Sequence, residues 1–352
     1  MGQMTRVNLN NYTISSNLSI KDAIKRMDKS GLEICICLDN KSKKVVGLFT
    51  EGDFRNAVHQ GINLNNKVIK ILNKKFHYVS SITNKSKIKK HFNKNVNCIP
   101  VIKNKKLIDI IFKNKIKKIS NYSKIPVVIM AGGKGTRLDP FTRILPKPLF
   151  PLGDKPIILK IIDQFNNWGF KKFYLSIHDK SKIIKAYFKN FKNIDVKFSE
   201  EPVPMGTIGA LRLLKSKLKK TFVVSNCDIL LKTDFDNVLS FHKEKKNVLT
   251  IVGSVRHYEI PYGICRLKNS GALKEIDEKP SYDYLVNTGV YIFEPSIIKY
   301  LKNKNKMDIN DLIKILVSKG LKIGVYPLST NSWFDFGQWN EINKNISNLK
   351  SF

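Results

Sequence analysis

Three glycines and two cations lie within the eight residues that follow the apolar run Pro126–Met130. Glycines leave backbone N–H groups bare, so phosphate oxygens can approach them closely. The run is not a Walker loop, because the Gly-Lys-Thr/Ser ending is absent. A further cation, Lys147, stands between two prolines, which restrict the backbone that presents it. The candidate residues of this segment are Ala131, Gly132, Gly133, Gly135, Thr136 and Arg137, of which the three glycines offer such N–H groups to phosphate oxygens.

The segment from Gly132 to Pro156 closely resembles the signature of nucleoside-diphosphate-sugar pyrophosphorylases, which reads GGxGTRLxPxT, PKPLxP and KP. So many matches at fixed offsets are far more specific than a single glycine-rich turn. The resemblance implies that Arg137 holds the departing β- and γ-phosphates of a nucleoside triphosphate and that Lys147 reaches the α-phosphate. Displacement at the α-phosphorus needs neutralised charge and in-line positioning rather than a covalent partner. No acid–base residue is required, because the sugar-phosphate nucleophile is already an anion.

Two acids that are far apart in the chain match the metal ligands of the same family. Asp228 follows the apolar run Phe222–Ser225, and Asp335 lies in Trp333–Gly337, which resembles the family's W-x-D-x-G. Mg²⁺ takes one or two carboxylates together with waters and phosphate oxygens, so this pair is sufficient. Each acid alone fits a cap or a turn, but as a pair in the family's order they are interpreted as ligands of Mg²⁺. This interpretation requires the two acids to meet beside the glycine-rich segment.

A second block, Glu200–Leu211, resembles the family's base-binding segment and implies nucleotide contacts from Glu201, Gly206 and Thr207. Family members that use uridine or thymidine nucleotides often have glutamine just before the proline, where this chain has Glu201. An ionised carboxylate only accepts hydrogen bonds, and guanine offers it two adjacent donors. Uracil has one donor flanked by carbonyls, so GTP is the favoured nucleotide. The alternative is that Glu200 or Glu201 is a solvated loop acid and that backbone groups read the base.

Polar residues between the two acids match the family's sugar-binding elements. In the triplet E-K-P, the resemblance implies that Glu278 accepts hydrogen bonds from sugar hydroxyls and that Lys279 pairs with the sugar phosphate. The resemblance covers nearly all of residues 125–345. The implied sugar-binding residues are Tyr262, Gly263, Glu278, Lys279, Asn287 and Thr288.

Apolar runs that alternate with helical patterns predict the fold that positions these residues. Strands are expected at 126–130, 173–177, 196–198, 221–225, 248–254 and 289–293, with helices at 157–168 and 181–191. The alternation predicts an α/β domain over residues 125–352, with a Rossmann-like, doubly wound mixed sheet. Ligands of such sheets bind beyond the carboxyl ends of the strands, which is where the glycine-rich segment and Asp228 are expected.

Residues 1–120 are expected to form a separate, smaller unit that contains two similar segments, each with a helix followed by two strands. In the first segment, Ser19 caps a helix and strands follow at 34–38 and 44–49, with another helix opening at Thr50. The second segment has a helix near 85–92 and strands at 98–102 and 107–112. This half resembles a tandem pair of CBS domains, small α/β modules that often bind adenosine nucleotides and regulate an attached enzyme.

The first copy has the Thr-x-x-Asp of the CBS family at Thr50 and Asp53, whose hydroxyl and carboxylate would contact the ribose and phosphate of a nucleotide. The second copy lacks this motif, so one adenosine-nucleotide site at most is supported. The alternative is that Thr50 and Asp53 simply cap a helix, which needs only these residue types. Homo-oligomerisation is expected in either case.

The formal net charge of +35 is the most unusual bulk property of the chain. Lysines spread along the sequence account for most of it, whereas arginine, the better bidentate reader of phosphates and bases, is scarce. A solvated lysine surface is therefore favoured over a nucleic-acid partner. Cys35 and Cys37 share a strand face, and the five cysteines lack zinc-type spacing, which indicates structural thiols. The chain start lacks the apolar core of a signal peptide, and no run approaches the ~20 residues of a membrane span, so a cytoplasmic location is expected.

Together these features predict a Mg²⁺-dependent sugar-1-phosphate nucleotidyltransferase that joins an NTP, with GTP favoured, to a sugar 1-phosphate and releases pyrophosphate. A CBS pair ahead of such a domain resembles the bacterial glucosamine-1-phosphate guanylyltransferases that supply GDP-glucosamine for legionaminic acid synthesis. Glucosamine 1-phosphate is therefore the first expectation. The alternatives are mannose 1-phosphate or a heptose 1-phosphate with GTP, and UTP- or CTP-dependent activation of a related sugar. In a different class stands a regulatory nucleotide-binding protein whose catalytic domain has lost activity.

Overall fold

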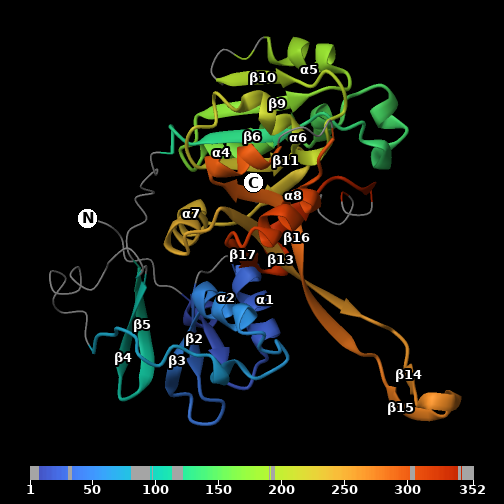
Figure 1. Ribbon diagram of the computed structural model, residues 1–352. Coiled ribbons are helices and arrows are strands. Elements are labelled where there is room, and N and C mark those ends of the chain that lie inside the picture. The colour runs from blue at the N-terminus through green and yellow to red at the C-terminus, as the bar shows by residue number, and fades with distance from the viewer. Residues whose placement is uncertain are drawn as a thin grey trace. The chain divides into compact units, whose positions relative to one another are not determined.

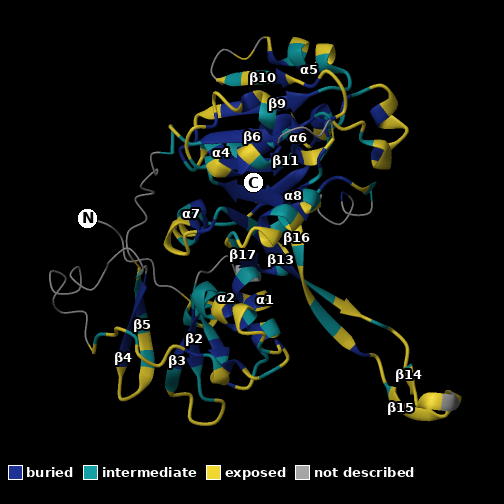
Figure 2. Ribbon diagram, in the orientation of Figure 1, coloured by how far each residue is buried: buried dark blue, intermediate teal, exposed yellow. Residues whose placement is uncertain are grey.

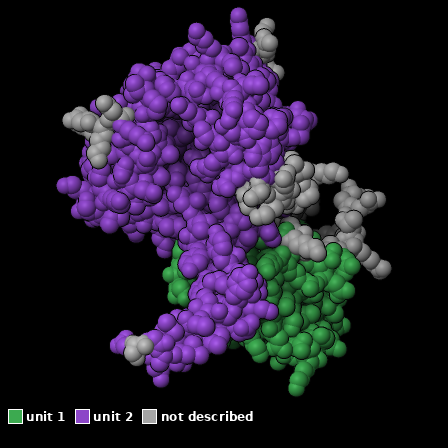
Figure 3. Space-filling view, turned by 90° about the vertical axis from the view of Figure 1, so that its right-hand side faces the viewer, with its two compact units in different colours: residues 1–118 green, residues 119–352 purple. Residues whose placement is uncertain are grey.

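The computed structural model describes residues 8–30, 34–80, 96, 98–112, 122–189, 191, 195–301, 306–339 and 342. Contacts divide the chain into two compact units, Met1–Lys118 and Ile119–Phe352, which Figure 3 colours separately. None of the helices in the described ranges combines the length and the apolar character that a membrane span requires.

The N-terminal unit contains two sheets in its described part. The first consists of β1 (Thr13–Ser15), β2 (Ile34–Leu38) and β3 (Val45–Thr50). Helix α1 (Ile20–Ser30) connects β1 to β2, and α2 (Glu51–His59) follows β3 directly. The second is a hairpin of β4 (Cys98–Lys103) and β5 (Lys106–Phe112). The strands expected in this half are therefore present, and the expected helix near 85–92 lies outside the described residues.

Strand β2 is buried on both faces, since Ile36 is covered as completely as Cys35 and Cys37 on either side of it. The prediction of one shared buried face for the two cysteines is thus correct but incomplete. Burial raises the pKa of the Cys35 and Cys37 thiols to about 12. Neutral, enclosed thiols of this kind are unreactive, which fits a structural role.

The C-terminal unit is built on a seven-stranded mixed sheet in the order β10-β9-β6-β11-β16-β13-β17 (Figure 1). The first four strands of this order are parallel, β16 is antiparallel to both of its neighbours, and β13 and β17 are parallel. The predicted fold class is confirmed. The strand bounds are β6 (Pro126–Met130), β9 (Lys172–Ile177), β10 (Val196–Glu200), β11 (Phe222–Asn226), β13 (Leu249–Glu259), β16 (Ser281–Phe293) and β17 (Ile323–Leu328).

Helices cover both faces of this sheet, which explains why its central strands are apolar throughout. In β6, Val127 and Ile129 join a core with α4 (Ile157–Asn166), α5 (Ser181–Phe188) and α7 (Phe235–Glu244). Val128 points the other way, into a core with α6 (Gly206–Gly209) and α8 (Ile309–Ser318). Figure 2 shows the central strands as buried. A parallel sheet enclosed in this way leaves the carboxyl ends of its strands as the place for a site.

Short elements connect these layers. The short strands are β7 (Pro151–Leu152), β8 (Lys155–Pro156), β12 (Ile229–Leu231), β14 (Ile264–Leu267), β15 (Leu273–Asp277) and β18 (Trp333–Asp335). The 3₁₀ turns are η1 (Leu9–Tyr12), η2 (Val68–Lys70), η3 (Thr136–Leu138), η4 (Phe141–Arg143), η5 (Lys147–Leu149), η6 (Ala210–Leu214), η7 (Asn269–Gly271), η8 (Pro295–Leu301) and η9 (Thr330–Ser332).

Strands β13 and β16 extend past the sheet as a two-stranded ribbon. Strand β17 accompanies β13 as far as Ser254, and beyond that point β13 and β16 continue to pair with each other up to Glu259 and Ser281. The hairpin of β14 and β15 forms the end of this projection (Figure 1). The sequence predicted these two strands as much shorter, at 248–254 and 289–293.

Candidate active site

The two predicted metal-binding acids lie side by side. Strand β12 pairs antiparallel with β18, which places Ile229 opposite Asp335, and the Phe336 N–H donates to the Asp228 carbonyl at 2.9 Å. A Cβ built on Gly337 would overlap Asp228 Oδ2 and would lie 3.0 Å from Asp335 Oδ1. Both carboxylates therefore converge on the Cα of Gly337, where any side chain would displace them.

Lys147 completes this cluster. Its Nζ donates to Asp228 Oδ2 and would lie 3.2 Å from the same Cβ on Gly337. Burial is the largest single influence and lowers the pKa of Lys147. The charge and hydrogen bond of Asp228, together with the nearby Cys227 and Asp335, outweigh burial, so that the pKa stands above its ordinary value. The lysine is therefore held as a cation in a partly enclosed position, where its charge is poorly screened by water.

The glycine-rich segment packs against this cluster. Gly135 has a φ of +71°, and a Cβ there would lie 2.9 Å from the Cβ of Lys147. The Thr142 hydroxyl donates to the Gly135 carbonyl at 3.0 Å and fixes the turn. Gly133 has no heavy atom within 4 Å of where its Cβ would be. Gly133 thus borders open space, and Thr136 and Arg137 are exposed.

Glu201 lies on the other side of this segment, next to Gly132. A Cβ on Gly132 would lie 2.5 Å from Glu201 Oε1. The carboxylate is 7% exposed and accepts hydrogen bonds from Ser176 Oγ at 2.8 Å and from the Met205 N–H at 3.0 Å. A carboxylate has about four acceptor positions, so Glu201 keeps capacity for further donors. Glu201 is thus an enclosed acid, whereas Glu200 is the exposed one and pairs with Lys185.

Thr207 is fastened to the start of α8. Its N–H donates to Asp308 Oδ1 at 2.9 Å, and its hydroxyl accepts from the Ile309 N–H at 2.9 Å. Gly206, with φ +79°, has no room for a side chain, because a Cβ would lie 2.6 Å from the Met307 carbonyl oxygen. The hydroxyl of Thr207 therefore holds the 205–209 segment in place, and nucleotide contacts from Gly206 and Thr207 stay predictions.

Asn287 and Thr288 lie at the base of the ribbon, near the end of β11. Asn287 accepts from the Gly289 N–H at 3.0 Å and donates to the Tyr291 hydroxyl at 2.8 Å, and Thr288 donates to the Val252 carbonyl at 2.8 Å. Gly289, with φ +86°, lies against the side chain of Asn226, whose amide a Cβ would overlap. Both predicted sugar-binding residues thus support the local backbone.

The remaining predicted sugar-binding residues lie on the outer ribbon. Gly263 faces Glu278, since a Cβ there would lie 2.8 Å from Glu278 Oε2, and Tyr262 is 74% exposed. From Val290, which pairs with β11, the chain runs nine residues of β16 before it reaches Ser281. At about 3.3 Å per residue this is roughly 30 Å of strand. Contacts of Glu278 and Lys279 with a sugar phosphate stay predictions.

The site contains residues that the sequence motifs did not indicate. His178 directly follows β9 and shares a 2.8 Å hydrogen bond from its Nδ1 with the Glu201 carbonyl. Asn226 ends β11 beside Gly289, and the Arg256 guanidinium lies over the Trp333 ring at 4.3 Å from its centroid. The position of His178 and Asn226 at the carboxyl ends of predicted strands was a signal that could have found them.

The acid pair fits Mg²⁺ by chemistry, because carboxylate oxygens are the ligands that this ion prefers. The ammonium group of Lys147 donates to one of them, Asp228. Among the residues that the structure describes, no group of three His, Cys, Asp or Glu side chains gathers as a metal site. An ion held here would therefore complete its coordination with waters and phosphate oxygens.

In the N-terminal unit, Thr50 and Asp53 form a reciprocal capping box at the start of α2. Asp53 N–H donates to Thr50 Oγ1 at 3.2 Å, and the Thr50 N–H and hydroxyl donate to Asp53 Oδ2 at 2.9 and 2.7 Å. Burial raises the pKa of the Asp53 carboxyl. The capping role expected as the alternative is present, and the adenosine-nucleotide site stays a prediction.

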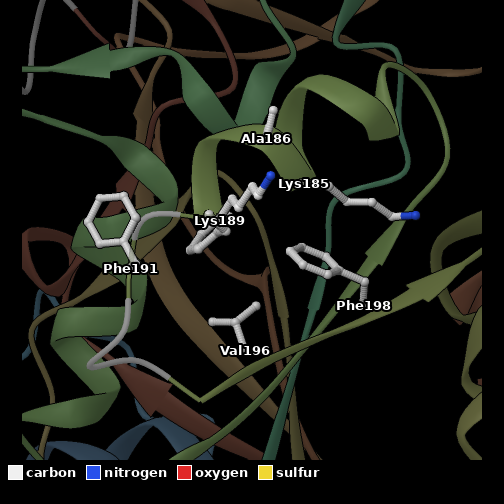
Figure 4. Close-up of a pocket in the computed structure, with 7 residues that line it drawn as sticks. Lys185, Ala186, Lys189, Phe191, Val196 and Phe198 are labelled. Carbon is white, nitrogen blue, oxygen red and sulfur yellow. The ribbon is translucent and has the colours of Figure 1, made fainter.

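A separate apolar pocket lies between α5 and β10 (Figure 4). None of the signature residues lines it, and its walls are three phenylalanines, two lysines and two small side chains. The lining residues are Lys185, Ala186, Phe188, Lys189, Phe191, Val196 and Phe198.

Comparison with known families identifies the class of protein. Residues 126–351 match the nucleotidyl transferase family, and residues 4–60 match the CBS domain. The chain therefore belongs to the nucleotidyl transferase family and carries an N-terminal CBS domain. The CBS match covers the first of the two copies that the sequence predicted.

Curated relatives make the class more specific. The chain is 31% identical over 238 residues to the bifunctional protein GlmU of Methanococcus aeolicus, covering 64% of this chain and 54% of that protein. It is 28% identical over 233 residues to a UTP–glucose-1-phosphate uridylyltransferase of Synechocystis, covering 60% of each. It is 29% identical over 222 residues to the mannose-1-phosphate guanyltransferase of Saccharomyces cerevisiae, covering 60% and 61%. The chain thus spans little more than half the length of these relatives, two of which are sugar-1-phosphate nucleotidyltransferases by name.

Solved structures share the fold. HddC from Yersinia pseudotuberculosis is 23% identical with a TM-score of 0.51, covering 64% of this chain and 99% of that chain. A putative glucose-1-phosphate thymidylyltransferase from Bacillus anthracis, in complex with sucrose, is 17% identical with a TM-score of 0.52, covering 65% and 96%. HddC has also been solved with GMP-PN.

Proposed function

We propose that this chain transfers a nucleotidyl group from an NTP to a sugar 1-phosphate and releases pyrophosphate. One observation carries the proposal. Asp228 and Asp335, which are far apart in sequence, converge with Lys147 on Gly337, and the glycine-rich segment packs directly against that lysine. Charge-neutralising groups and backbone donors beside open space are what displacement at phosphorus requires.

The roles follow from position. Asp228 and Asp335 would hold Mg²⁺, which supplies positive charge to the phosphate oxygens when bound. The backbone N–H groups from Gly132 to Gly135 bind phosphate, with Arg137 exposed at the end of the segment to hold the leaving pyrophosphate. Lys147 orients the α-phosphate and, because it stays charged, stabilises the growing negative charge there.

GTP is the proposed nucleotide. Glu201 supports it, because this buried carboxylate lies beside Gly132 and can accept from the two adjacent donors of guanine. Exchanging Glu201 for Gln tests the argument by comparing GTP with UTP turnover, with Glu200→Gln as the matched control on an exposed acid. We expect Glu201→Gln to reduce the preference for GTP and Glu200→Gln to leave it unchanged. An unchanged preference in both variants would remove Glu201 from base recognition.

Glucosamine 1-phosphate is the proposed sugar substrate, giving GDP-glucosamine for nonulosonic acid synthesis such as that of legionaminic acid. The support is the CBS domain ahead of the catalytic unit, combined with Glu201. Mannose 1-phosphate is the second candidate, favoured by the mannose-1-phosphate guanyltransferase among the relatives. A matrix of GTP, UTP, CTP and dTTP against hexose and hexosamine 1-phosphates, followed by Mg²⁺-dependent pyrophosphate release, decides between them. Absence of release across the whole matrix would instead favour a regulatory nucleotide-binding protein.

A further inference from the structure

Arg256 lies over an aromatic ring that belongs to the strand of the metal-binding acids. Its guanidinium carbon is 4.3 Å from the centroid of Trp333. Trp333 and Asp335 are two residues apart in β18, so they point to the same face, while Phe334 between them is buried in the core. Two residues of strand span about 7 Å, so the guanidinium stacks on a ring that projects from the same face of β18 as Asp335.

Arg256 makes no ion pair with any of the residues that the structure describes. Basic side chains near it in the projection have acidic partners: His257 contacts Asp283 at 2.8 Å, and Arg266 pairs with Glu275 and Asp277 at 3.3 and 3.4 Å. Arg256 is half-buried, and a guanidinium in such a place is commonly matched by an anion. Stacking on Trp333 holds its fork in one orientation without occupying the N–H donors.

A cation on the Trp333 side of the acid pair would favour the binding of a phosphate group there. A phosphate monoester that approaches Asp228 and Asp335 meets negative charge in a partly enclosed site. Lys279, the residue expected to pair with the sugar phosphate, lies outside β16, five residues from Tyr284 along the chain. Arg256, which pairs with Tyr284, is in contact with β18 through Trp333, two residues from Asp335.

We propose that Arg256, held in place by Trp333, binds the phosphate group of the sugar 1-phosphate. The proposal rests on the proposed nucleotidyl transfer and adds to it the residue that receives the second substrate. The planar guanidinium donates two parallel hydrogen bonds to phosphate oxygens. A third oxygen of the same phosphate then faces the α-phosphorus of the NTP and attacks it, and the bond from that phosphorus to the departing pyrophosphate breaks.

Steady-state kinetics on full-length variants test the assignment. In Arg256→Gln we expect the KM for the sugar 1-phosphate to rise about 10- to 100-fold, the loss of hydrogen bonds to a charged group, while the KM for the NTP changes less than about threefold. Arg256→Lys keeps the charge and much of the stem, so it should raise the same KM by a smaller factor and serves if the glutamine variant does not fold. Arg266→Gln removes the same charge on β14 and should match the wild type.

A binding measurement separates this inference from the proposed function. Calorimetric titration with inorganic phosphate should give about tenfold weaker binding in Arg256→Gln than in the wild type and in Arg266→Gln. Equal phosphate affinity in all three proteins, no phosphate binding by the wild type, or a rise in the KM for the NTP instead of the sugar phosphate would each overturn the assignment. If the wild type releases no pyrophosphate with any substrate pair, the proposed function fails, and the phosphate titration still decides the role of Arg256.

Discussion

Replacing Gly337 with alanine tests the acid–lysine cluster without removing any of its charged groups. The new Cβ would overlap Asp228 Oδ2 and crowd Asp335 Oδ1 and Lys147 Nζ at 3.0 and 3.2 Å. Both carboxylates must rotate away from their rotamers, at about 0.5–1.5 kcal/mol each. Alanine also restricts the unfolded chain, which offsets about 0.4–1 kcal/mol. We therefore expect a net loss of stability of about 0–2.6 kcal/mol, which lowers the Tm by a few degrees.

The effect on catalysis should be much larger than the effect on stability. A displacement of about 1 Å in groups that position a reaction costs on the order of 100-fold in rate. Gly337→Ala should thus lower kcat for Mg²⁺-dependent pyrophosphate release by about two orders of magnitude and shift the Mg²⁺ concentration that gives half-maximal activity upward.

Gly324, in strand β17, supplies the matched control, because a Cβ there would overlap the side-chain amide of Asn247. Strand β17 pairs with the amino-terminal half of β13. Gly324→Ala should lower the Tm while kcat stays within about threefold of the wild type. Wild-type kcat and Mg²⁺ dependence in Gly337→Ala would refute the idea that the acids and Lys147 act as one unit.

Three further outcomes are expected. Burial lowers the pKa of His242 despite its hydrogen bond to Glu294, so the folded state binds fewer protons than the unfolded chain. The free energy of unfolding should therefore be highest above about pH 6.5 and fall on acidification, by at most about 1.4 kcal/mol per pH unit. Thermal melts of His242→Gln should show a weaker dependence of Tm on pH. Asp53→Ala should lower the free energy of unfolding of the N-terminal unit by about 0.5–2 kcal/mol through the lost cap, measured by denaturant unfolding. It should also abolish any adenosine-nucleotide binding seen by calorimetry. Intact binding would leave Asp53 with the capping role alone. Gly133→Ala should melt like the wild type, because its Cβ meets open space, yet weaken NTP binding more than tenfold, and unaltered affinity would show that phosphate does not approach there.

The sequence predicted the parallel strands β6, β9 and β11 well because each is a short, mostly apolar run with clear ends. Strands β6 and β9 match their expected bounds within one residue. The ribbon was underestimated, since its outer residues, such as Arg256 and Tyr284, have the mixed polarity of a surface segment. Cross-strand pairing rather than burial extends it, and pairing between distant segments leaves little local signal.

Site residues in continuous motifs could be predicted from the sequence. Contacts between segments that meet only in the folded chain could not. Asp228 and Asp335 were found as a pair by family resemblance, but their contact depends on the pairing of β12 with β18. The stacking of Arg256 on Trp333 joins residues of two different sheets, and no spacing rule connects them. Burial of Glu201 likewise depends on Ser176 and the Met205 amide, which a linear reading does not place beside it.

The register shift between Val252 and Gly253 lies close to where the ribbon leaves the sheet. A register shift bends a strand pair locally, so a small rotation there displaces the far end of the ribbon by several ångströms. For an arm of roughly 25 Å, a swing of about ten degrees carries the tip by about 4 Å. The positions of the Glu278 and Lys279 side chains therefore depend strongly on the backbone conformation at this register shift.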